Sequence, residues 1–196
     1  MSTGKLIITA KGADAKLINR LLLHVRDWEF GDEDSWDMHR ILRTKDEASA
    51  GELPVDAPPV IGCLENQWEG LSLEEVEKLM LLKDDGEGST SLFLVLDDKG
   101  QQDQTLIVAH RALNPDRDTL WLPEYNKVRV PWQEVHGMWV NLDIANMDFE
   151  AFCDGEIGAG ESHWWAYRPI VGEDHYVEFA KKRDSAIKEL EKLDLA

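Results

Sequence analysis

Cysteine is scarce in this chain, and long hydrophobic runs are absent. The two cysteines, Cys63 and Cys153, lie inside short apolar segments, which is typical of buried free thiols and not of a disulfide scaffold. The longest apolar runs, such as 92–96 and 106–109, fall far short of the roughly 20 residues that a membrane-spanning helix needs. No small-residue cleavage site follows the apolar start at 1–10, so the sequence predicts no secretory signal and a cytoplasmic location.

Positive charge is also in short supply. The chain has 21 Lys and Arg against 39 Asp and Glu, which gives a formal net charge of −18. A field of this sign repels phosphate backbones and anionic lipid headgroups, so nucleic acids and membranes are disfavoured as partners. Solubility through self-repulsion is the simplest interpretation of the charge, and a basic protein partner is the main alternative.

The motifs of nucleotide binding, covalent catalysis and metal binding are missing as well. No Walker loop, no G-x-G-x-x-G after a strand and no G-x-S-x-G elbow occurs, and the six histidines are scattered singly. We therefore predict no cofactor and no metal. A metal site assembled from His110, His136 and a carboxylate is the weaker alternative, while His24 lies among core-facing helix positions and is interpreted as a core histidine.

What the sequence does contain is the pattern of one α/β domain over residues 1–196. We expect a mixed central sheet of about five strands flanked by helices. Strands are indicated at 5–10, 39–44, 60–64, 91–96, 104–110 and 127–130. Helices are indicated after Gly12, over 73–82, from Pro131 to Gly137, over 147–153 and over 174–194.

Several of these expectations rest on local signals. Ser72 and Glu75 form the spacing of a capping box at the start of the helix at 73–82, and Asn146 is placed to cap the helix at 147–153. The segment 29–59 is predicted to be a mobile acidic excursion, and 156–173 a loop rich in Gly and Trp. The helix at 174–194 is expected to dock on the domain, and it leaves homo-oligomerisation open as an alternative.

Four stretches of the chain resemble a family of small domains of unknown function found in actinobacterial and fungal proteins. They are the strand at 5–9, the acidic turn and capped helix at 64–75, the paired strands at 92–97 and 106–109, and the segments 128–132 and 141–152 with the string Asn146-Met-Asp-Phe-Glu150. The resemblance covers roughly Lys5 to Asp154. It implies one domain and one topology, and it carries no activity, cofactor or catalytic residue.

Two functions are consistent with these residues. The first is a non-enzymatic interaction module, because Trp36, Trp164 and Trp165 lie in segments without a core pattern and exposed aromatic residues mark contact surfaces. The alternative is a small-molecule enzyme or ligand-binding domain with a site at the strand ends, where ligands collect in α/β sheets. Its candidate residues are Asp97, His110, Glu134 and Asn141. The sequence does not decide whether the protein is an enzyme, but it favours a protein without enzymatic activity.

Overall fold

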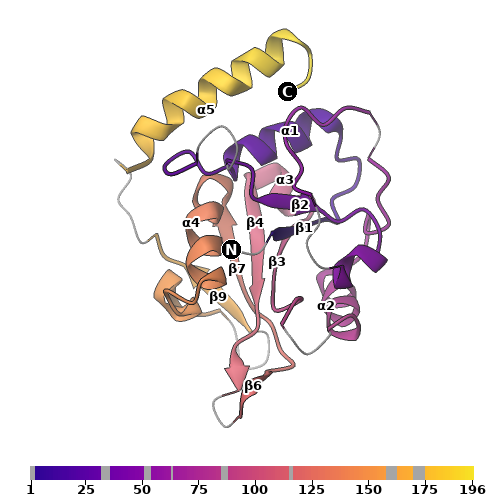
Figure 1. Cartoon of the computed structure of the whole chain (residues 1–196), viewed down its shortest axis with the longest axis vertical. Helices are drawn as coiled ribbons and strands as arrows, with labels where there is room; N and C mark the ends of the chain where they lie inside the picture. The colour runs from indigo at the N-terminus through magenta and orange to yellow at the C-terminus, as the bar shows by residue number, and fades with distance from the viewer. Residues whose placement is uncertain are drawn as a thin grey trace.

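A seven-stranded mixed sheet forms the centre of the computed structural model, in the order β2-β1-β3-β4-β7-β9-β8 (Figure 1). The structure describes residues 3–31, 36–50, 54–62, 64–84, 88–114, 117–157, 163–169 and 175–196. The strands are β1 Gly4–Ile8, β2 His39–Ile41, β3 Leu92–Leu96, β4 Thr105–His110, β7 Asn126–Pro131, β8 Cys153–Glu156 and β9 Trp164–Tyr167. β1 runs parallel to β2 and β3, whereas β4 is antiparallel to both β3 and β7.

The sheet is buried on both faces because alternate side chains of its central strands enter two different cores. Leu6, Leu94 and Val128 face a core that they share with helices α1 (Ala15–His24) and α4 (Trp132–Asp143). Ile7 and Phe93 face a second core on the side of α2 (Leu73–Leu82). The strands therefore read as continuous apolar runs, as expected for strands covered on both sides.

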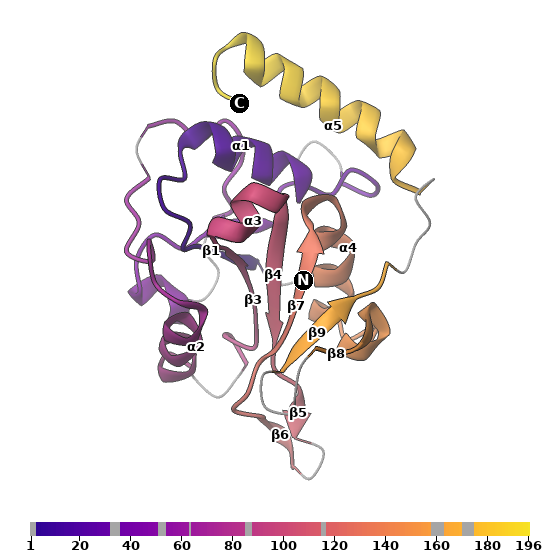
Figure 2. The ribbon, with the colours of Figure 1, turned by 180° about the vertical axis from the view of Figure 1, so that it is seen from behind.

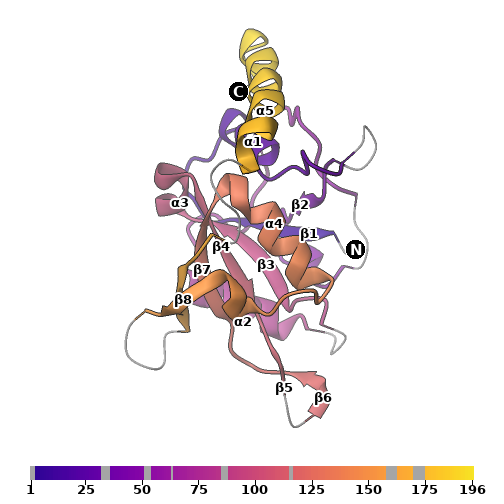
Figure 3. The same ribbon diagram turned by 90° about the vertical axis from the view of Figure 1, so that its left-hand side faces the viewer.

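The remaining elements lie at the periphery. Helix α3 (Asp98–Asp103) links β3 to β4, and 3₁₀ turns occupy η1 (Asp46–Ser49) and η2 (Phe149–Phe152). The two-stranded sheet of β5 (Leu113–Asn114) and β6 (Arg117–Trp121) projects at the end of the molecule opposite helix α5 (His175–Lys192), as Figures 2 and 3 both show.

Helix α5 and the chain that follows it lie against α1. Arg20 forms an ion pair with Glu191 at 2.7 Å, and Lys16 forms one with Asp194. The fully buried side chain of Asn19 donates to the carbonyl oxygen of Leu195 at 2.7 Å. The described residues of α5 are only half-buried or exposed, so this helix covers the domain without entering its core.

The predicted fold class is confirmed, with seven strands in the main sheet instead of about five. The capping box is also present: the Ser72 hydroxyl accepts from the Glu75 amide at 3.3 Å, and the Glu75 carboxylate accepts from the Ser72 amide at 2.8 Å. Cys153 is a buried free thiol, and Cys63 lies outside the described residues. Among the described residues, the structure has no helix with the length and apolarity to cross a membrane.

Several predicted boundaries are wrong. The strand expected at 39–44 is present as β2, but it is shorter, His39–Ile41, and pairs with β1. This part of the predicted excursion is packed, since His39, Ile41, Leu42 and Ala48 are buried. The expected strand at 60–64 is absent from its described residues, where Ile61 is exposed. The predicted loop at 156–173 contains β9, which is held in the sheet by hydrogen bonding to β7 and β8.

Two helix predictions around residue 140 need correction too. Helix α4 continues through Gly137 to Asp143 because Met138, Trp139 and Leu142 bury on its inner face. Asn146 does not cap a helix: its side chain donates to the Asn141 side chain at 2.6 Å, and the turn that follows begins at Phe149. Phe149, Phe152 and Cys153 turn inward as expected.

Candidate functional site

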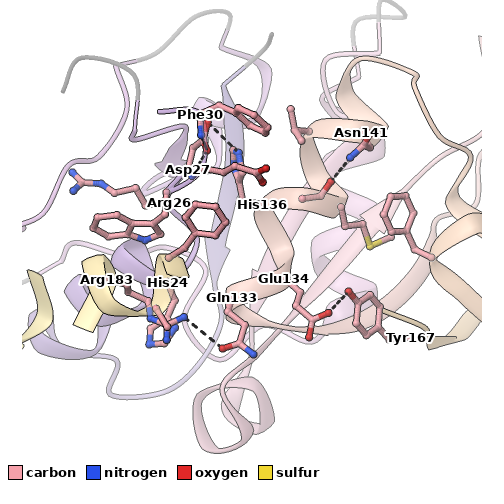
Figure 4. Close-up of a pocket in the computed structure, with 18 residues that line it drawn as sticks. His24, Arg26, Asp27, Phe30, Gln133, Glu134, His136, Asn141, Tyr167 and Arg183 are labelled. Atoms are coloured by element: carbon pink, nitrogen blue, oxygen red, sulfur yellow. Dashed lines mark hydrogen bonds and ion pairs between the residues drawn. The ribbon is translucent and has the colours of Figure 1, made fainter. Parts of the chain in front are cut away.

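A cavity of about 250 Å³ lies between α4, the chain that leaves α1, strand β9 and helix α5. Figure 4 shows the side chains that surround it. Its wall is mainly apolar and aromatic, and is built by Trp28, Phe30, Met138, Val140, Phe152, Tyr167 and Phe179. Polar groups reach it from both sides, with His24 and Asp27 on the α1 side and Gln133, Glu134, His136 and Asn141 on α4. A small apolar cavity with a few converging polar groups is the usual form of a ligand site.

Asp27 and His136 form the first polar pair. One carboxylate oxygen of Asp27 accepts from the amides of Glu29 at 3.1 Å and Phe30 at 2.9 Å, which fixes the turn after α1. The other lies 3.6 Å from Nε2 of His136. Burial acts to raise the pKa of Asp27, but the contact with His136 and the two amides prevail and lower it to about 2. Asp27 is therefore ionised at neutral pH.

An ion pair and two aromatic rings hold the turn that carries Asp27. Arg26 pairs with both carboxylate oxygens of Asp37, at 2.8 and 2.6 Å. Its guanidinium carbon lies 5.3 Å from the Trp28 ring centre and 5.1 Å from that of Trp36. A Cβ on Gly31 would lie 1.9 Å from Cδ1 of Trp36, so the close approach of Trp36 requires glycine there. Trp36 is thus half-buried against its own chain, and its predicted role in partner binding stays a prediction.

His39 supports His136 from the core. It is 2% exposed, and its ring centre lies 6.3 Å from that of His136 and 5.0 Å from that of Trp139. Burial, with a smaller effect of His136, lowers the pKa of His39 to about 3, so the ring is neutral at physiological pH. A Cβ on Gly4 would lie 2.2 Å from Nδ1 of His39, and glycine is therefore needed in β1 to admit this ring.

Glu134 and Tyr167 form the second polar pair of the wall. The Tyr167 hydroxyl donates to a carboxylate oxygen of Glu134 at 2.7 Å, which joins α4 to β9. His24 lies across the cavity, with its ring edge-on to Trp132 at 5.6 Å between centres. Burial, and then the nearby Arg183, lowers the pKa of His24 to about 4, so it too is neutral at physiological pH.

Gly137 supplies free space in the same wall. It lies in the middle of α4 and lines the cavity, and a Cβ built on it would meet no described heavy atom within 4 Å. The sequence predicts a helix end at this glycine, and no local pattern indicates Asp27 or Tyr167 as site residues. The glycine was the one available signal, since helix interiors rarely favour it.

The structure brings together only two of the four predicted strand-end residues. Glu134 and Asn141 both line the cavity. Asp97 instead caps α3, and both of its carboxylate oxygens accept from Arg129, at 2.9 and 2.7 Å. Burial acts to raise the pKa of Asp97, but the hydrogen bonds with Arg129 and Gly100 prevail and lower it.

His110 lies at the opposite end of the sheet from Asp97, because β4 is antiparallel to β3 and His110 pairs with Leu92. Its ring stacks on Phe149 at 6.0 Å between centres, and burial lowers its pKa to about 4. His110 and His136 therefore have different surroundings. In the part of the chain that the structure describes, no group of three or more His, Cys, Asp or Glu side chains is placed to hold a metal ion.

Trp164 and Trp165 belong to β9 and point to opposite faces of the sheet. Trp165 packs against the core on the side of α1 and α4, and its indole nitrogen donates to the Asn126 side chain at 3.3 Å. Trp164 packs against the other core and lines a second cleft, of about 640 Å³, beside α2. Three carboxylates border this cleft, Glu74, Glu77 and Glu124, and Glu77 is paired with Lys127 at 3.1 Å.

Comparison with known families places residues 23–162 in a domain family of unknown function. The match confirms the resemblance indicated by the sequence, although it begins later in the chain than residue 5 and extends beyond residue 154. It includes Asp27, Glu134, Gly137 and His136 and stops short of Tyr167 and helix α5. No curated protein and no solved structure matches the chain.

Proposed function

Because the chain belongs to the DUF6924 family, a domain of unknown function, we propose its role from the geometry of the cavity: it is a binding domain for a small molecule. The observation that carries the proposal is the glycine in the cavity wall. Glycine in a helix interior costs about 0.5–1 kcal/mol relative to alanine, and at position 137 an alanine side chain would meet no described atom within 4 Å. Gly137 therefore weakens α4 and leaves the cavity open.

The size of the cavity limits the ligand. An apolar protein cavity of about 150 Å³ admits benzene, and the cavity here measures about 250 Å³. A molecule with one aromatic ring and one polar substituent therefore fits. The described residues of the wall include no serine, threonine or cysteine, and the proposal is for binding alone.

Three probes of equal size test the proposal: benzyl alcohol, benzylamine and benzoate, titrated by ligand-observed NMR. At least one should bind with a Kd of about 1 mM or tighter, a modest affinity for so few atoms. Gly137→Leu should abolish this binding by filling the cavity, whereas Gly137→Ala should retain it. Both variants should melt cooperatively. Failure of all three probes, or full binding by a folded Gly137→Leu protein, contradicts the proposal.

The acidic interaction module is a second candidate, supported by the cleft beside α2. Trp164 offers an aromatic surface there, and Glu74 and Glu124 are exposed carboxylates at its border. Among the described residues, neither carboxylate has an ion-pair partner. This combination of an aromatic surface and negative charge suits a lysine-rich segment of a partner protein.

A labelled lysine-rich peptide tests this second candidate by fluorescence anisotropy. Reversing both charges, Glu74→Lys with Glu124→Lys, should weaken binding more than the matched pair Glu150→Lys with Glu156→Lys, which changes the net charge equally. Equal loss in both double variants would mean that only the overall charge attracts the peptide.

A further inference from the structure

Two carboxylates of the cavity wall, Asp27 and Glu134, form no ion pair with a described Lys or Arg. Among the described residues, the only basic side chain within ion-pair distance of Asp27 is His136, and Glu134 has a hydrogen bond only with the Tyr167 hydroxyl. The two arginines of the wall already have partners. Arg26 is paired with Asp37, and Arg183 contacts Asp184 at 3.2 Å and donates to the Gln133 side chain of the wall at 3.5 Å. Neither arginine forms a described ion pair with Asp27 or Glu134.

Glu134 is the carboxylate that is available to a ligand. One oxygen of Asp27 accepts from two backbone amides, and the other lies 3.6 Å from Nε2 of His136. Only one oxygen of Glu134 accepts a described donor, the Tyr167 hydroxyl. The second oxygen can accept a hydrogen bond from a charged donor, which is stronger than a bond between neutral groups.

The aromatic part of the wall favours the same kind of ligand. Trp28 and Phe179 already lie beside cations of this chain, Arg26 at 5.3 Å and Lys182 at 5.9 Å, which leaves the other rings of the wall for a ligand. Tyr167 supplies ring surface beside Glu134, whereas Phe30 lies beside Asp27 and His136 on the other side of the cavity. Ring faces attract ammonium groups most strongly where water is excluded.

We propose that the ligand is a small organic cation, an aromatic or short alkyl amine, whose ammonium group binds the carboxylate of Glu134 and whose apolar body lies against the aromatic wall. This inference rests on the proposed binding function and adds its ligand class. An anionic ligand of the same size is disfavoured, because it would face Glu134 and Asp27 without a free arginine.

The three probes of equal size separate the ligand class from the binding function. Isothermal titration near neutral pH uses about 0.15 M salt, which screens the general attraction of the −18 chain for cations. Benzylamine should bind at least about tenfold more tightly than benzoate, with benzyl alcohol between them. Glu134→Gln should weaken benzylamine at least about fivefold and change benzyl alcohol by less than about twofold.

Glu150→Gln is the matched control, because it removes the same charge from an exposed position in η2. It should leave benzylamine binding unchanged. Equal affinity for all three probes, or an equal effect of Glu134→Gln and Glu150→Gln, overturns the ligand class and leaves the binding function intact. Absence of binding by every probe overturns the binding function itself.

Discussion

Asp97 and Glu134 are both carboxylates that the sequence places in one site, and the structure gives them opposite surroundings. Asp97 accepts two hydrogen bonds from Arg129 and one from the Gly100 amide at 2.7 Å, at the start of α3. Glu134 accepts one described hydrogen bond, from a neutral hydroxyl, and faces a cavity. The first carboxylate is fully used in holding β3, α3 and β7 together, and the second has capacity left for a ligand.

The comparison teaches that position at the end of a strand does not identify a binding carboxylate. What distinguishes the two groups is how many donors each one already has. A carboxylate that holds a guanidinium through two oxygens has a structural role. A carboxylate beside apolar surface with an unused oxygen is the better candidate for binding.

The largest expected effect is a loss of folding stability at mildly acidic pH, caused by the buried histidines. On the cavity side, His24 and His39 have pKa values of about 4 and 3, against 6.5 for the unfolded chain. His110, stacked on Phe149, has a pKa of about 4. Below about pH 6.5 these histidines bind protons in the unfolded state but not in the folded state. Their contribution to stability is therefore present above this pH and is lost as the pH falls toward 4.

Each of these histidines should lower the free energy of unfolding by up to about 1.4 kcal/mol per pH unit in this window. Asp97, whose folded pKa is lowered from 3.8, contributes its own loss only below about pH 4. Urea unfolding between about pH 7 and pH 5 measures the effect. His39→Gln should flatten the slope by about one proton. A stability that is constant over this range would contradict the assignment of neutral histidines.

A smaller change in stability is expected when Asp97 and Glu134 are each replaced by the corresponding neutral amide. Asp97→Asn keeps the shape of the side chain but leaves Arg129, whose side chain is 20% exposed, without its anion. This should cost about 2 kcal/mol, a typical value for hydrogen bonds to a charged group. Glu134→Gln keeps an acceptor for Tyr167 and should cost less than about 1 kcal/mol.

Chemical denaturation of both variants measures the difference in stability. Titration with benzylamine measures the difference in binding. Asp97→Asn should bind like the unaltered protein, whereas Glu134→Gln should not. If the two variants were equally destabilised and equally impaired in binding, the distinction between a structural and a binding carboxylate would be wrong.

The sequence predicts those parts of the fold that are specified by neighbouring residues. The helix at 73–82 follows from Ser72 and Glu75 three positions apart, and the central strands follow from continuous apolar runs. β9 could not be found in this way. Its place depends on parallel pairing of Trp164 with Lys127, a contact between distant residues that leaves no local pattern.

The sequence predicts part of the candidate site, and the rest differs for a topological reason. It indicates Glu134 and Asn141 together with Asp97 and His110, on a rule that holds for parallel strands. Because β4 is antiparallel to β3, the carboxyl ends of these strands lie at opposite edges. Asp27 was missed because its partner, His136, is more than a hundred residues away in the chain, and no spacing rule connects them.

The smallest expected effect concerns Gly137 and has the opposite sign. If the glycine has no structural purpose within α4, Gly137→Ala should stabilise the protein by about 0.5–1 kcal/mol, since alanine has the higher helix propensity and would meet no described atom within 4 Å. Urea denaturation measures this change. Gly100→Ala in α3 is the contrasting control: its Cβ would lie 2.3 Å from the carbonyl oxygen of Thr105, so that variant should be less stable. A destabilised Gly137→Ala protein would mean that α4 needs glycine for packing. The cavity would then be a by-product of the fold, and the proposal that it binds a small molecule would lose its main support.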